Sequence, residues 1–119
     1  MEMSAFVYDY DHNAPDTAHL EATHEKMFKK IRAAHPNLPI IIMPRPKFHL
    51  SRDEQTRFEI IKKTYRNAIN AGDKNVYLLT GKELMEIAGD EGTVDDCHPT
   101  DFGFASIAKA VGDLLEKIL

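Results

Sequence analysis

The stretch Pro-Ile-Ile-Ile-Met at residues 39–43 decides how the rest of the chain is interpreted. It shows no alternation of apolar and polar residues, so a strand made from it must be buried on both faces. Strands of this kind lie inside parallel sheets that carry helices on both sides. Pro36 before the run and Pro44-Arg45-Pro46 after it limit its length.

Two segments with helical periodicity flank this run. We expect a helix from about residue 17 to residue 34, with Asp16 as its N-cap. A second helix is expected to begin at the capping box of residues 51–54 and to end at Gly72. The apolar stripes predicted to be buried are Leu20, Met27, Ile31 and Ala34 in the first helix, and Phe58, Ile61, Tyr65, Ala68 and Ile69 in the second.

The same alternation continues to both ends of the chain. Residues 5–10 and 76–80 are expected to form the first and third strands, and residues 82–88 a short helix. The last helix is expected to run from Asp101, capped by Thr100, to the end of the chain. Strands alternating with helices predict an α/β domain of three layers, α/β/α, around a parallel sheet. The stripe of the last helix comprises Phe104, Ile107, Val111, Leu114, Leu115 and Ile118.

Composition narrows the class of protein. The 119 residues suit one domain, and 43% hydrophobic and 29% charged residues are ordinary for a globular protein. A net charge of -4 argues against a nucleic-acid partner, which selects for a basic face. No apolar run approaches the roughly 20 residues of a membrane span. The single cysteine, Cys97, excludes an intrachain disulfide.

Three loops are expected at the carboxyl end of the sheet, which is where parallel α/β sheets bind ligands. His12 and Asn13 follow the first strand, and Arg45 follows the second. Asp95 and His98 follow the third strand and the short helix. All of these residues should face the same end of the domain.

Asp95 and His98 have the spacing of an acid that orients a general base. In such a pair the histidine takes a proton from a nucleophile, and the acid holds its tautomer and stabilises the imidazolium. The same residues could also be an ordinary loop pair that caps the last helix. Asp96 is a rival acid, and Cys97 is interpreted as a small buried side chain.

The residues of the first two loops also allow simpler interpretations. Asn13 could stabilise a turn. His12, with Asp9 and Asp11, resembles a metal-ligand cluster, but further spaced ligands are lacking and no metal is expected. Arg45 could bind an anionic substrate group or cap the end of a strand.

Two further histidines lie in the segment expected to form the first helix. His19 and His24 are five residues apart, which differs from the i, i+4 spacing of the helical zinc motif. We expect both at the surface.

Two blocks resemble a known family. Residues 7–15, Val-Tyr-Asp-Tyr-Asp-His-Asn-Ala-Pro, are similar to the block that carries the oxyanion-hole asparagine of GDSL-like, or SGNH-type, esterases, in a form close to a bacterial branch. Residues 94–103, Val-Asp-Asp-Cys-His-Pro-Thr-Asp-Phe-Gly, are similar to the family's last block, which carries its acid and base. The resemblance implies that Asn13 donates its amide to the oxyanion, that His98 is the base and that Asp95 is its partner.

The resemblance also implies a flavodoxin-like fold, a small-molecule ester as substrate and no cofactor. The family's Gly-Asp-Ser block, which carries the nucleophile, has no counterpart in these residues. Ser4, Ser51 and Ser106 lack a glycine-rich turn that would expose them. We therefore expect residues 1–119 to be the C-terminal portion of one SGNH hydrolase domain, inactive alone.

Two alternatives come from other classes of protein. A non-catalytic α/β binding or assembly module would need no nucleophile. A receiver-like signalling domain shares the strand-helix alternation and could use Asp9 and Lys82, but it needs more strands.

The family's sheet has five strands in the order 2-1-3-4-5, so three strands would leave the first as an apolar edge. Bare edges pair with other chains. The expected partner is a second copy, giving a homodimer, or the missing segment.

Overall fold

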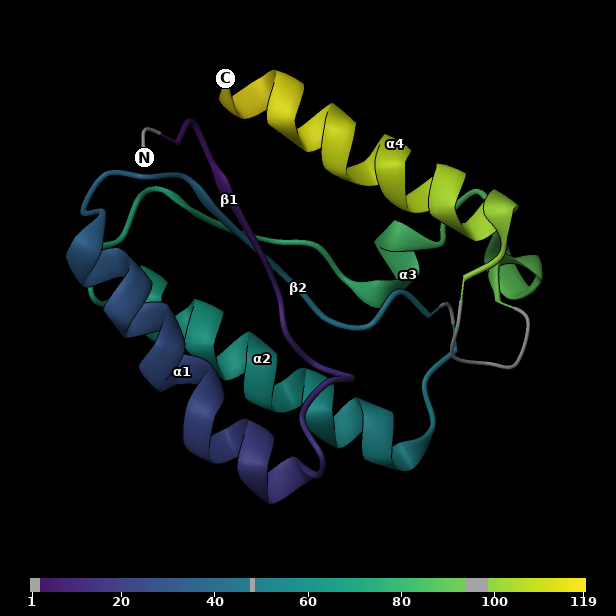
Figure 1. Ribbon diagram of the computed structural model, residues 1–119, viewed down its shortest axis with the longest axis horizontal. Coiled ribbons are helices and arrows are strands. Elements are labelled where there is room, and N and C mark those ends of the chain that lie inside the picture. The colour runs from purple at the N-terminus through teal and green to yellow at the C-terminus, as the bar shows by residue number, and fades with distance from the viewer. Residues whose placement is uncertain (1–2, 48, 94–98) are drawn as a thin grey trace.

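The three expected strands form one parallel sheet with β2 in the middle (Figure 1). The computed structural model describes residues 3–47, 49–93 and 99–119. The sheet is open, and its strands follow the order β1-β2-β3. The strands are β1 (Phe6–Asp9), β2 (Ile40–Met43) and β3 (Val76–Leu78).

Helices cover both faces of the sheet, which confirms the predicted α/β/α layers. Figure 1 shows α1 (Thr17–Ala34) and α2 (Arg52–Asn70) side by side on one face and α4 (Asp101–Ile118) on the other. The short helix α3 (Gly81–Leu84) and a 3-10 turn, η1 (Gly89–Gly92), connect β3 to α4. Within the described part of the chain, no helix is long and apolar enough to cross a membrane.

The central strand is buried along its whole length, as the apolar run predicts. Ile40, Ile41 and Ile42 have no exposed surface, and Met43 has almost none. Ile40 and Ile42 pack with the apolar residues of α1 and α2, whereas Ile41 and Met43 belong to the cluster under α4. Each such side chain contributes about 1.5–3 kcal/mol on burial, so β2 is the common core of both layers.

The predicted helix caps are present. The Asp16 carboxylate accepts a hydrogen bond from the His19 amide at 2.7 Å, and Ser51 forms the capping box with Glu54. Thr100 accepts from the Gly103 amide at 3.0 Å. The third strand is shorter than expected because Thr80 instead caps α3.

The end of α2 is closed by a glycine in the left-handed region. Gly72 has φ of 93°, and its amide donates to the Ile69 carbonyl. The Asp73 amide donates to the Ala68 carbonyl at 3.0 Å. This pair of bonds is a Schellman motif, which satisfies carbonyls that the helix leaves open.

The predicted buried stripes are wrong at several positions. Met27, Ile69 and Phe104 are exposed, although apolar periodicity predicted them to be buried, and Ala34 is exposed as well. The helices are rotated because polar residues occupy part of their buried faces and find hydrogen-bond partners there. The buried residues are Leu20, His24 and Phe28 in α1, and Glu54, Arg57, Ile61, Thr64 and Ala68 in α2.

His24 is fully buried, which corrects the expectation that it lies at the surface; His19 is exposed as expected. The His24 ring stacks on Tyr8 with centroids 4.6 Å apart, and Nδ1 of His24 lies 2.8 Å from the Thr64 hydroxyl. Burial lowers the pKa of His24 to about 4, although the carboxylates of Asp11 and Glu25 oppose the shift. The folded protein therefore holds this imidazole in its neutral form.

His24 predicts a loss of stability in mild acid. The unfolded chain binds a proton near pH 6.5 and the folded chain near pH 4, so the unfolded state binds more protons in this window. The free energy of unfolding should fall by about 1.4 kcal/mol per pH unit at most, on the order of 3 kcal/mol in total. Urea unfolding at pH 7, 6, 5 and 4 measures it.

His24→Phe, which retains a ring beside Tyr8, should flatten this dependence, whereas the surface change His19→Gln should preserve it. Parallel pH curves for wild type and His24→Phe would contradict the assignment.

Candidate active site

The loop after β1 presents His12 and Asn13 to solvent. Both side chains are exposed, whereas Asp11 and Ala14 on either side of them are buried. The Ala14 amide donates to the Asp11 carbonyl at 3.1 Å, which closes a tight turn. The turn therefore directs the two candidate residues outward, while Asp11 and Ala14 on either side of them stay buried.

The guanidinium of Arg57, on α2, holds this turn from inside the protein. Its Nη1 donates to the Asp11 carbonyl at 2.9 Å and to the Ala14 carbonyl at 3.2 Å. Its Nη2 also donates to the Ala14 carbonyl, and its Nε donates to Asp53 at 3.2 Å. The Arg57 side chain is only 7% exposed. One side chain thus fixes both ends of the segment that carries Asn13.

The Asp11 carboxylate ties this loop to the exit of β2. Its Oδ2 accepts a hydrogen bond from the Arg45 amide at 2.9 Å. Its Oδ1 lies 3.6 Å from Nη1 of Arg57. The loops after β1 and β2 therefore lie together, which confirms that His12, Asn13 and Arg45 belong to the same end of the sheet.

Arg45 itself forms an ion pair within the protein. Its Nη1 lies 2.6 Å from Glu54, whose other oxygen binds Lys47 at 2.8 Å. Burial alone would raise the pKa of Glu54, but hydrogen bonds from Lys47, Ser51 and Arg45 lower it to about 2. Glu54 is thus a carboxylate at neutral pH. This pairing favours the structural interpretation of Arg45, while substrate binding by Arg45 stays a prediction.

The start of α3 packs closely on the segment after β2. A Cβ at Gly81 would lie 2.7 Å from the carbonyl oxygens of both Arg45 and Lys47. Only glycine allows the two backbones to approach this closely. The exit of β3 is therefore held against the exit of β2.

The ends of the third candidate loop are also fixed. Thr93 and Pro99 form an antiparallel bridge, and the Thr100 amide donates to the Gly92 carbonyl at 2.8 Å. Gly103, in the first turn of α4, packs against the backbone of Gly92, where any side chain would overlap the carbonyl. In Figure 1, this end of α4 lies at the side of the domain where β2 ends.

Asp95 and His98, with Asp96 and Cys97, lie outside the described residues. Their proposed pairing therefore stays a prediction. The described residues on either side of them are Thr93 and Pro99.

Sequence reasoning missed the charged groups beneath the loops. Asp11, Glu54 and Arg57 are all buried. The available signal was their spacing: residues 54 and 57 continue the line of Ile61, Thr64 and Ala68 along one face of α2. A charged residue in such a line needs a partner inside the protein.

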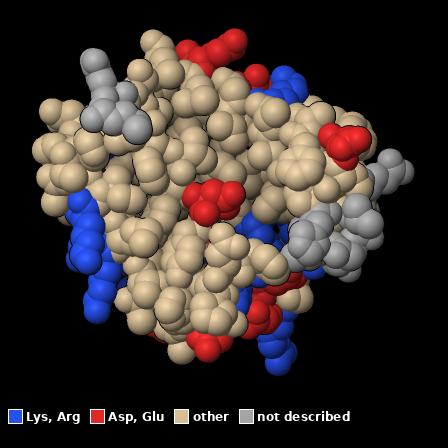
Figure 2. All heavy atoms as spheres, in the orientation of Figure 1, with Lys and Arg blue, Asp and Glu red and all other residues tan. Residues whose placement is uncertain are grey.

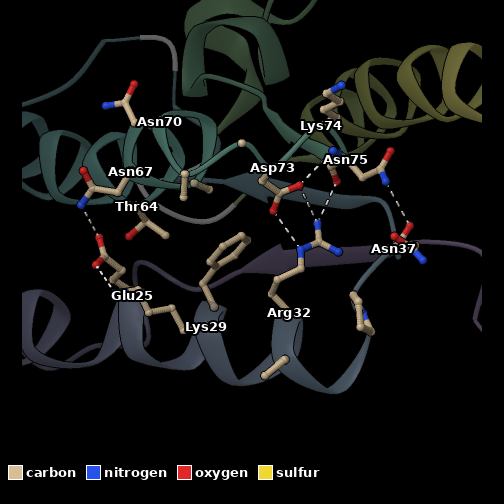
Figure 3. Close-up of a pocket in the computed structure, with 16 residues that line it drawn as sticks. Glu25, Lys29, Arg32, Asn37, Thr64, Asn67, Asn70, Asp73, Lys74 and Asn75 are labelled. Carbon is tan, nitrogen blue, oxygen red and sulfur yellow. Dashed lines mark hydrogen bonds and ion pairs between the residues drawn. The ribbon is translucent and has the colours of Figure 1, made fainter.

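A groove lies at the opposite end of the domain, among the described residues. It has a volume of about 960 Å³ and runs between the C-terminal halves of α1 and α2 (Figure 3). Arg32 points into it, but its guanidinium donates to Asp73 and to the carbonyls of His35, Leu38 and Asn75. These bonds join the turns before β2 and β3, so Arg32 is a structural residue there.

Among the described residues, no group of three or more histidine, cysteine, aspartate or glutamate side chains could hold a metal ion.

A family model described as the GDSL-like Lipase/Acylhydrolase family matches residues 1–116. The chain belongs to this family. The match spans nearly the whole chain, including both blocks that carry the candidate site. A comparison with curated proteins gave no match.

Solved structures share the fold. A protein described as a GDSL-like lipase from Bacteroides ovatus ATCC 8483 matches 99% of this chain, with a TM-score of 0.79 and 24% identity. A family two carbohydrate esterase from Clostridium thermocellum matches 98%, with a TM-score of 0.77 and 13% identity. A salicylyl-acyltransferase of a tetracycline biosynthetic pathway matches 99%, with a TM-score of 0.73 and 18% identity.

The chain spans only part of each of these proteins. It covers 36% of the lipase, 36% of the esterase and 38% of the acyltransferase.

Proposed function

We propose that residues 1–119 form the C-terminal portion of one SGNH hydrolase domain and supply its base, its acid and one oxyanion donor. The reaction is hydrolysis of a carboxylic ester through an acyl-serine intermediate. The observation that carries the proposal is the arrangement of the two family blocks. Arg57 binds the Asp11 carbonyl in the loop of Asn13, and Thr93 and Pro99 form a bridge at the flanks of the Asp95–His98 segment.

Each residue has a defined role in this proposal. His98 takes the proton of the attacking serine and later returns it to the leaving alcohol, while Asp95 orients the imidazole. Asn13 donates its side-chain amide to the oxyanion, and loss of such a donor typically costs about 10²–10³ in rate. We assign the nucleophile to no serine of these residues, because Ser51 caps α2 and the Ser106 hydroxyl donates to the Leu84 carbonyl at 2.7 Å.

The substrate is proposed to be a small-molecule ester such as an acylated carbohydrate or lipid. Two structural neighbours, a carbohydrate esterase and a GDSL-like lipase, support this class. No cofactor takes part in the proposed reaction, since the protein groups alone transfer the proton and stabilise the charge.

Hydrolysis of p-nitrophenyl acetate tests the catalytic proposal. Because p-nitrophenolate leaves readily, a histidine can accept the acetyl group even without a serine, so the chain should accelerate this reaction over buffer. His98→Ala should remove most of the acceleration, and Asn13→Ala should reduce it by about a hundredfold. An alkyl ester, whose leaving group is poor, should not react.

His35→Gln is the matched control, because it removes an imidazole at the C-cap of α1, at the opposite end of that helix from the candidate loop. Equal rates for wild type and His98→Ala would contradict the proposal. The alternative, a non-catalytic binding or assembly module, would then be favoured by the absence of a Gly-Asp-Ser triplet in these residues.

We also propose that the chain associates through the open edge of β1, as a homodimer or with a complementary segment. Among the described strands, β1 pairs with β2 alone. The Phe6 amide donates to the Pro39 carbonyl, so the backbone groups of Val7 and Asp9 point to the open side. Val7 is 39% exposed, and Figure 2 shows mostly uncharged atoms on this side of the molecule, with an acidic group at its centre.

Light scattering tests this association. The purified chain should have the mass of a dimer, and Val7→Lys should shift it towards monomer because a charged edge resists pairing. A wild-type chain that remains monomeric at high concentration would contradict association with itself.

A further inference from the structure

We propose that Arg57 is the positioning residue of the loop that presents Asn13. This inference rests on the proposed function of Asn13 and adds a residue on a different element. Arg57 acts through the backbone of that loop, at the carbonyl groups of Asp11 and Ala14.

The geometry of the turn makes one arginine sufficient. The carbonyl groups of Asp11 and Ala14 are directed inward, and both accept hydrogen bonds from Nη1 of Arg57 at 2.9 and 3.2 Å. His12 and Asn13, between them, are exposed. A short turn fixed at both ends from inside cannot rotate its outer residues independently of α2.

The orientation of the guanidinium is set independently of the loop. Asp53, four residues earlier on α2, accepts from Nε at 3.2 Å, and Asp53 also accepts from the Thr17 hydroxyl at 3.1 Å. The charge of Arg57 is further compensated by Asp11, 3.6 Å away. These contacts orient the planar guanidinium towards the two carbonyl groups. A lysine has a single flexible ammonium group and cannot reproduce this arrangement.

Burial of this charge favours a functional reason for keeping it. Ion pairs in protein interiors are often no more stabilising than apolar residues of the same volume. Ile61, one turn along the same face of α2, shows that the site is otherwise suited to apolar packing. What an apolar side chain would lose is the fixed position of the loop.

The chain offers a matched control in Arg32. Like Arg57, it is a largely buried arginine that donates to several backbone carbonyls and to an aspartate. The carbonyl groups that Arg32 binds belong to the turns before β2 and β3, at the amino end of the sheet (Figure 3). Arg32→Lys therefore disturbs the fold in a comparable way without touching the candidate site.

The first experiment is ¹⁵N relaxation on the full chain carrying Arg57→Lys. The order parameter of the Asn13 amide should be near 0.85 in wild type and fall below about 0.6 in Arg57→Lys, while β2 stays rigid. Arg32→Lys should leave Asn13 unchanged and loosen residues 73–75 instead. An unchanged order parameter of Asn13 in Arg57→Lys, or an equal fall in Arg32→Lys, would overturn the proposal.

A measurement on wild type keeps the proposal testable if Arg57→Lys does not fold. The Nη protons of Arg57 should exchange with solvent at least about tenfold more slowly than those of the exposed Arg52, because they are bonded to carbonyl groups in a buried site. Equal exchange of the two arginines would contradict the fixed contact.

Kinetics separate this inference from the proposed function. With p-nitrophenyl acetate, Arg57→Lys should lower kcat about tenfold with little change in KM, and should add nothing in the Asn13→Ala background, because coupled residues are not additive. Additive losses would overturn the positioning role while leaving the esterase proposal intact. A chain that shows no His98-dependent hydrolysis would contradict the esterase proposal, whereas the relaxation result would still decide whether Arg57 fixes the loop.

Discussion

Burial of β2 on both faces is the constraint on which the other elements depend. Ile40 and Ile42 require the layer of α1 and α2, and Ile41 and Met43 require the layer of α4. A helix on each side can be connected to parallel strands only by crossovers, and these bring all the strand exits to one end. The position of the candidate loops therefore follows from five apolar residues in the middle of the chain.

Buried arginines then fix the loops at the two ends of the sheet. Arg57 and Arg32 lie on neighbouring helices of the same layer. Arg57 donates to carbonyl groups on both sides of one turn. Arg32 donates to carbonyl groups of two chain segments, one before β2 and one before β3. At the carboxyl end, Arg45, Lys47 and Arg57 are matched by Asp11, Asp53 and Glu54. These ion pairs hold the first two candidate loops together.

Much of the fold could be predicted because its signals are local. The apolar run gave β2, and Asp16, Ser51 and Thr100 cap the helices that they were expected to cap. The orientation of the helices could not be read from apolar periodicity, because buried polar residues are satisfied by partners distant in the sequence. His24 and Thr64, which are 40 residues apart, are one such pair.

The same limit applies to the candidate site. Its exposed residues, His12 and Asn13, were identified from a sequence block, whereas the groups that hold them, Asp11 and Arg57, were not. A block records which residues stand side by side along the chain. It does not record that Arg57, which is 46 positions after Asp11 in the sequence, binds the Asp11 carbonyl group.

The central claim is that this chain carries the acid–base pair of an esterase, and the pKa of His98 tests it most directly. An NMR titration of the imidazole in wild type, Asp95→Asn and Asp96→Asn compares the two rival acids. A paired carboxylate stabilises the imidazolium and typically shifts a pKa by about 1–3 units. We expect Asp95→Asn to lower the pKa of His98 by about one unit or more, and Asp96→Asn to change it little. A larger shift in Asp96→Asn, or no shift in either variant, would contradict the assignment.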